Sequence, residues 1–128
     1  MFLGNVTNWT AVVGADVPFT TELNTNGKIR NSAGEISILE RGLWDIDASL
    51  VVTGVVGTVT VQLFADGVAV PTTFASATLD LATDFQTISL TDTIRTIFAQ
   101  YPDVANISVR VDTAGVVVSG KIRVENVR

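Results

Sequence analysis

The sequence predicts an all-β fold, an antiparallel sandwich of about eight to ten short strands. Apolar and polar residues alternate with period two along most of the chain, which is typical of half-buried strands. Gly, Asn, Asp or Pro separates these runs, and no long segment keeps the i, i+3, i+4 apolar stripe of a helix. The strand spacing suits both an immunoglobulin-like domain and a jelly roll.

The first strands are expected to be short. Residues 17–23, 27–31 and 35–39 each alternate over a few positions. We predict one jelly-roll domain over residues 14–128, and an N-terminal arm or additional edge strand over residues 1–13.

The segment 43–53 is predicted to be a long strand with one apolar face. That face carries Trp44, Ile46, Ala48, Leu50 and Val52. After residues 54–57, the next strand places four apolar residues on one face, namely Val59, Val61, Leu63 and Ala65. Asp66-Gly67 then predicts a tight hairpin turn.

Further strands are predicted over residues 72–79, 85–90, 93–98, 106–111 and 116–127. Breaks are expected at Pro71, Asp80, Asp92, Pro102 and Gly115.

Composition excludes several classes of function. Apolar residues make up 47% of the chain and charged residues 16%, which favours a substantial apolar contact surface. The net charge of −5 argues against a nucleic-acid partner. The uncharged residues 48–65 contain enough Ser, Thr and Gly to favour two strands over a membrane helix. The first residues lack the pattern of a cleavable secretory signal.

Candidate chemistry is sparse. With no histidine and no cysteine, the commonest acid–base residue and the thiolate nucleophile are both missing, so we do not expect an enzyme. Asp45 and Asp47 point to the same strand face, where they are either ordinary solvated acids, a carboxylate pair for catalysis, or ligands for Ca²⁺. No other cofactor is expected.

The order of elements from Gly42 onward resembles a known superfamily. The run Gly42-Leu43-Trp44-Asp45-Ile46 is similar to the opening of a central strand in the tumour-necrosis-factor and complement-globular-head jelly rolls. Residues 57–79, GTVTVQLFADGVAVPTTFASATL, resemble small bacteriophage and bacterial members, and residues 108–127 resemble their final hairpin.

The resemblance implies a homotrimer with a role in display or recognition. The leading expectation is a non-enzymatic virion structural protein, assembled in the host cytoplasm, that decorates a capsid or forms a head fibre. The alternative is a receptor-binding module, a tail-fibre tip or surface knob that recognises host glycans.

Six residues are candidates for these contacts. Leu43 and Phe64 lie opposite the main apolar rows and are expected either at the trimer interface or in a second core layer. Phe2, Leu3 and Trp9 are candidates for a capsid anchor, although a frayed terminus or an edge strand is equally compatible with this segment. Tyr101 is a candidate for stacking on a glycan.

Overall fold

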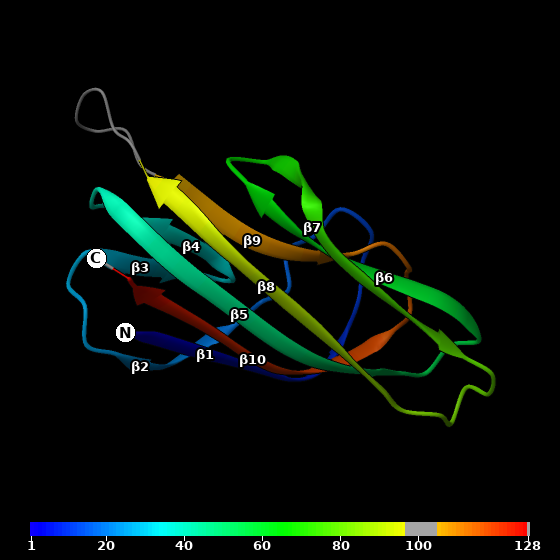
Figure 1. Ribbon diagram of the computed structural model, residues 1–128. Coiled ribbons are helices and arrows are strands. Elements are labelled where there is room, and N and C mark those ends of the chain that lie inside the picture. The colour runs from blue at the N-terminus through cyan, green and yellow to red at the C-terminus, as the bar shows by residue number, and fades with distance from the viewer. Residues whose placement is uncertain (97–104, 128) are drawn as a thin grey trace.

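The computed structural model describes residues 1–96 and 105–127, and in this part it contains strands and no helix (Figure 1). Two five-stranded antiparallel sheets pack face to face, as a β-sandwich requires. The strands of sheet A, in spatial order, are β2 (Thr20–Asn24), β1 (Phe2–Thr10), β10 (Val117–Asn126), β5 (Gly42–Thr53) and β8 (Gln86–Thr96). Those of sheet B are β3 (Ile29–Ser32), β4 (Glu35–Ile38), β9 (Ala105–Val111), β6 (Gly57–Ala65) and β7 (Val68–Leu79).

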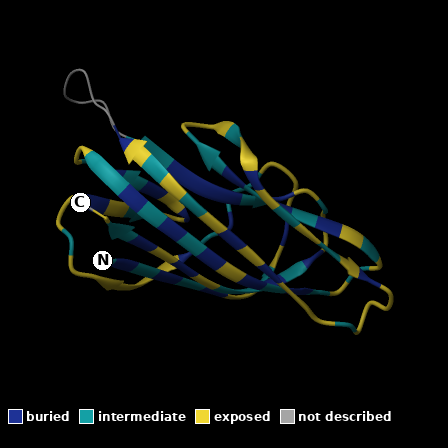
Figure 2. Cartoon of the chain, in the orientation of Figure 1, coloured by how far each residue is buried: buried dark blue, intermediate teal, exposed yellow. Residues whose placement is uncertain are grey.

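The core lies between the sheets and follows the predicted alternation, which appears as regular bands along the strands in Figure 2. All five residues of the predicted row on β5 are buried, and so are three of the four on β6; Ala65, next to the hairpin turn, is half-buried. Trp44 is fully buried, and its Nε1 donates to Thr96 Oγ1 at 3.2 Å. Thr96 Oγ1 in turn donates to the Glu40 carbonyl at 2.6 Å, so the polar end of the indole is satisfied inside the core.

The hairpin predicted at Asp66-Gly67 is confirmed. It connects β6 to β7, and the two residues have φ values of 52° and 78°. These positive values are the ones that a two-residue hairpin turn needs and that Asp and Gly tolerate.

Two predicted strand breaks are wrong. Pro71 lies inside β7, which is the edge strand of sheet B, and an edge strand tolerates a proline because one side of its ladder is unpaired. Asp92 lies inside the single strand β8, paired with Ile46 of β5. Its carboxylate accepts hydrogen bonds from Thr73 Oγ1 and from the Thr93 amide, so a turn-forming residue is held in an extended strand.

Residues 1–13 are not a separate arm. Phe2–Thr10 is β1, which lies between β2 and β10 in sheet A, and Phe2 pairs with both Asn24 and Val124. Phe2 is fully buried in the core. The segment predicted as an arm or an edge strand is therefore an inner strand of sheet A.

Sheet A depends on one close approach between strands. Gly120 of β10 lies opposite Leu50 of β5, and a Cβ added to it would lie 2.1 Å from the Ser49 carbonyl oxygen. Any larger residue would force the two central strands apart.

No helix in the described residues is long and apolar enough to cross a membrane.

Candidate assembly surfaces

The register of sheet A arranges its outward side chains in rows across four strands. We call this surface face A. One row consists of Leu3, Arg123, Asp47 and Thr91, from β1, β10, β5 and β8. The next consists of Asn5, Lys121, Ser49 and Ser89. Long side chains on β1 and β10 therefore stand beside short hydroxyl side chains on β5 and β8.

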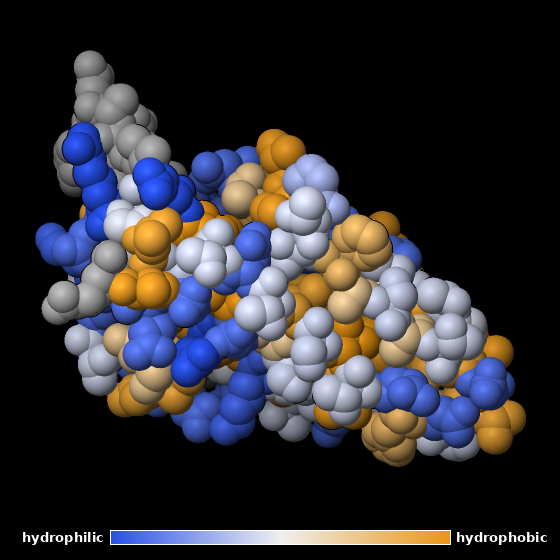
Figure 3. Space-filling view, in the orientation of Figure 1, coloured by the Kyte–Doolittle hydropathy of each residue, from blue (hydrophilic) through white to orange (hydrophobic). Residues whose placement is uncertain are grey.

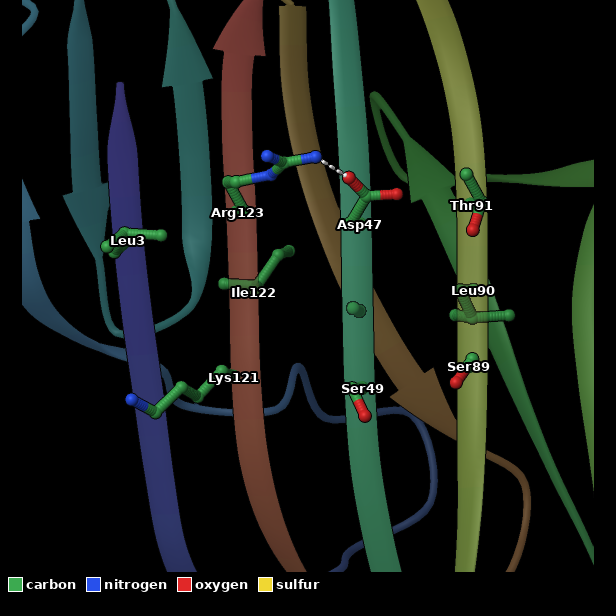
Figure 4. Close-up of a pocket in the computed structure, with 10 residues that line it drawn as sticks. Leu3, Asp47, Ser49, Ser89, Leu90, Thr91, Lys121, Ile122 and Arg123 are labelled. Carbon is green, nitrogen blue, oxygen red and sulfur yellow. Dashed lines mark hydrogen bonds and ion pairs between the residues drawn. The ribbon is translucent and has the colours of Figure 1, made fainter.

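This contrast in side-chain length produces a shallow open hollow of about 390 Å³ on face A. Figure 4 shows its lining: the short Ser49 and Ser89 leave space above β5 and β8, and Leu3, Lys121 and Arg123 form the opposite side. A concave strip of small side chains is well shaped to receive an apolar group from another molecule.

Several charges on face A are paired within the chain. Arg123 binds the Asp47 carboxylate and lies 3.4 Å from Glu125, and Asp45 accepts a hydrogen bond from Thr93 Oγ1 at 2.8 Å. The hydrogen bond with Asp47 raises the pKa of the Arg123 guanidinium, which therefore stays protonated. The two predicted Ca²⁺ candidates are thus engaged by an arginine and a threonine, and no group of three possible metal ligands forms in the described residues.

Apolar side chains border this charged centre. Leu3 pairs with Leu23 of β2, which is 41% exposed. At the other side, the Val127 amide donates to the Leu43 carbonyl at 2.8 Å, and the Val127 side chain is 43% exposed. Face A therefore combines apolar borders with a cluster of one arginine and three carboxylates, in which Arg123 pairs with Asp47 and Glu125.

The outward side of sheet B, which we call face B, is different because its polar groups bind one another. The hydroxyls of Thr58 and Thr78 are 3.2 Å apart, and those of Thr60 and Ser76 are 2.7 Å apart. Gln62 Nε2 donates to the Val70 carbonyl at 3.1 Å. Because these side chains already bind partners across the strands, they have few hydrogen bonds left to offer to another subunit.

Phe64 is covered by its own chain. The Arg110 guanidinium lies 4.3 Å above its ring centroid and also forms a 2.9 Å ion pair with Asp16. A cation positioned over an aromatic face is attracted to it electrostatically. Face B therefore contains an internal contact at the position predicted for a trimer contact.

The six contact candidates predicted from the sequence thus do not lie together in the structure. Leu43 and Leu3 lie on face A and Phe64 on face B, so Leu43 and Phe64 do not form one patch. Trp9 is half-buried against the core. Tyr101 lies outside the described residues.

Two exposed aromatic residues, Phe74 and Phe85, were not among the sequence candidates. Phe74 is 58% exposed on the edge strand β7. Phe74 lies in a predicted strand in which either Thr73 or Phe74 could face the core, so the alternation alone does not show which face is buried. The register settles this: Phe74 pairs with Gln62, which faces outward.

The fold is shared with several solved structures. The globular domain of zebrafish complement 1qA protein matches with a TM-score of 0.77 at 8% identity, over 99% of this chain and 96% of the other. The Eiger TNF from S. frugiperda matches with a TM-score of 0.64 at 10% identity, over 99% and 93%. The vertex protein of phage PRD1 matches with a TM-score of 0.62 at 15% identity, over 99% and 96%.

These likenesses establish the fold of this chain. It is an all-β jelly roll of the tumour-necrosis-factor and complement-globular-head type, a fold that also occurs in a phage vertex protein. The predicted fold class and the resemblance are confirmed. No protein-family model matches the chain, and no curated protein matches its sequence.

Proposed function

We propose that this chain is a non-enzymatic structural protein of a virion, which forms a homotrimer and binds the capsid lattice as a decoration or head-fibre subunit. The observation that supports the proposal best is the likeness to the PRD1 vertex protein, which extends over 99% of this chain. The lack of histidine and cysteine, and the internal pairing of the acids on face A, fit a protein that works through its surface.

Face A is the surface that we assign to the trimer contact. A closed ring of three subunits needs two different patches on each subunit, because every contact is head-to-tail. The hollow of face A supplies the concave patch. We assign the second patch to the edge formed by β7 and β8, since it carries the exposed Phe74 and since Thr73 Oγ1 joins the two strands through Asp92 at 2.7 Å.

The experiment that tests the virion role uses particles assembled without this chain. Purified protein added to them should bind in a saturable and stoichiometric manner, and no sugar should compete. An absence of binding would contradict the proposed role.

A host-glycan receptor role is the alternative. It predicts attachment to host cells that a soluble glycan blocks and that Tyr101→Ala weakens. The binding assay on particles and the assay on cells together distinguish the two roles.

A further inference from the structure

The end of the sandwich opposite the two termini is formed by loops that carry most of the exposed apolar side chains. We call residues 11–16, 54–56, 80–85 and 112–116 the loop tip; they connect the strands at the right-hand side of Figure 1. Nine large apolar residues are exposed in the described chain, and five of them lie in these loops. These five are Val12, Val13, Val56, Leu81 and Phe85, with exposures of 61%, 62%, 68%, 61% and 69%.

Hydrogen bonds hold these loops together. The Gly54 amide donates to the Ala82 carbonyl at 3.0 Å, joining the β5–β6 and β7–β8 loops. The Gly115 amide donates to the Ala11 carbonyl at 3.0 Å, joining the β9–β10 loop to the segment after β1. Within residues 80–85, the Leu81 amide donates to Asp84 Oδ2 and the Asp84 amide donates to the Leu81 carbonyl, both at 3.0 Å. The tip is therefore ordered before any partner binds, which reduces the entropy lost on binding.

The charge of the loop tip has one sign. Its four loops contain four charged residues, all acidic: Asp16 is paired with Arg110 of β9, whereas Asp80, Asp84 and Asp112 form no ion pair within the described residues. Figure 3 shows the hydrophobic and hydrophilic surfaces side by side at this end. A rigid apolar surface among carboxylates is complementary to an apolar recess bordered by Lys and Arg. An anionic bilayer and a second copy of the same tip are both disfavoured by charge repulsion.

We propose that the loop tip is the end that docks on the particle, in an apolar recess of the capsid protein whose border is basic. This inference rests on the proposed function, and it assigns to the loop tip the anchoring role that the sequence analysis gave to residues 1–13. Phe85 and Leu81 fill the recess, and Asp80, exposed at the start of the same loop, faces the basic border.

The test measures binding of purified variants to particles assembled without this chain. Val56→Ser and Val68→Ser form a matched pair, because both valines are 68% exposed and Val68 lies at the β6–β7 hairpin, outside the tip. We expect Phe85→Ser to weaken binding about tenfold or more, and Val56→Ser several-fold. Val68→Ser should bind as the unchanged protein does. Asp80→Lys should weaken binding at low salt, and the loss should shrink as salt rises.

The possible results distinguish a failure of the proposed virion role from a failure of the proposed docking end. If the unchanged protein fails to bind these particles, both the proposed function and the docking end are wrong. If it binds and the tip variants bind equally well, only the docking end is wrong. Equal losses for Val56→Ser and Val68→Ser, or binding of the unchanged protein to vesicles of anionic phospholipid that the tip variants abolish, would also overturn it. Circular dichroism and light scattering identify any variant that misfolds. If Phe85→Ser misfolds, the test relies on Val56→Ser and Asp80→Lys, which change exposed residues.

Discussion

The two outer faces of the sandwich have similar strands and a similar supply of Ser and Thr, yet they differ in how their polar groups are used. On face B, hydroxyls bind hydroxyls across β6 and β7, and Arg110 covers Phe64. On face A, Ser49 and Ser89 line an open hollow next to Leu3 and the charged β10 side chains. The paired hydroxyls of β6 and β7 are suited to solvent, whereas the hollow of face A with its apolar borders is suited to a neighbouring subunit.

The largest expected effect is a loss of stability when the close approach of the strands beneath face A is blocked. Replacing Gly120 with valine places a side chain against the Ser49 carbonyl oxygen, so we expect a loss of about 3 kcal/mol or more in the free energy of unfolding. Urea denaturation measures this loss. The control is Gly27→Ala, where a Cβ meets nothing within 4 Å and the change should stay within about 0.5 kcal/mol. Equal stability of Gly120→Val and the unchanged protein would contradict the close approach.

The next effect concerns assembly. Ser49→Arg fills the hollow of face A with a long charged side chain and should dissociate the trimer into folded monomers. Thr58→Arg places the same side chain on face B, again from an exposed hydroxyl residue, and should leave the trimer intact. Size-exclusion chromatography with light scattering compares the two. If only Thr58→Arg dissociated the trimer, the interface would lie on face B and our assignment to face A would be wrong.

A smaller effect should follow from removing the internal contact on face B. Arg110→Met loses the interaction with the Phe64 ring and the ion pair with Asp16, so we expect about 1 to 2 kcal/mol of destabilisation without a change in oligomeric state. Thermal denaturation measures it, with the exposed Arg30→Met as the control. If Arg110→Met dissociated the trimer, Phe64 would belong to the subunit interface, contrary to our assignment.

The smallest effect concerns Ca²⁺. Since Asp45 and Asp47 are engaged by Thr93 and Arg123, we expect a chelator to leave the Tm unchanged. A rise in Tm on adding about 1 mM Ca²⁺ would restore the carboxylate pair as a cation site.

The sequence predicted the fold well where one face of a strand is buried. The row from Trp44 to Val52 and the Asp66-Gly67 turn were readable because period two and turn chemistry are local properties. Pro71 and Asp92 were misinterpreted because their tolerance depends on strand neighbours, which local sequence does not contain. The same limit explains why Phe2 was assigned to an arm: its burial comes from β2 and β10, which are distant in sequence.

The candidate contacts were harder to predict than the core. Leu43 and Phe64 both oppose an apolar row, and only the register assigns them to different faces. The loop tip gave no periodic signal, since its five exposed apolar residues come from three loops that are distant from one another in sequence.

In the proposed trimer, a neighbouring copy of this chain covers face A of each subunit. Light scattering of the purified protein at micromolar concentration tests it most directly. We expect a mass of about 41 kDa, three times the 13.6 kDa of one chain. A stable species of 13.6 kDa under these conditions would contradict it.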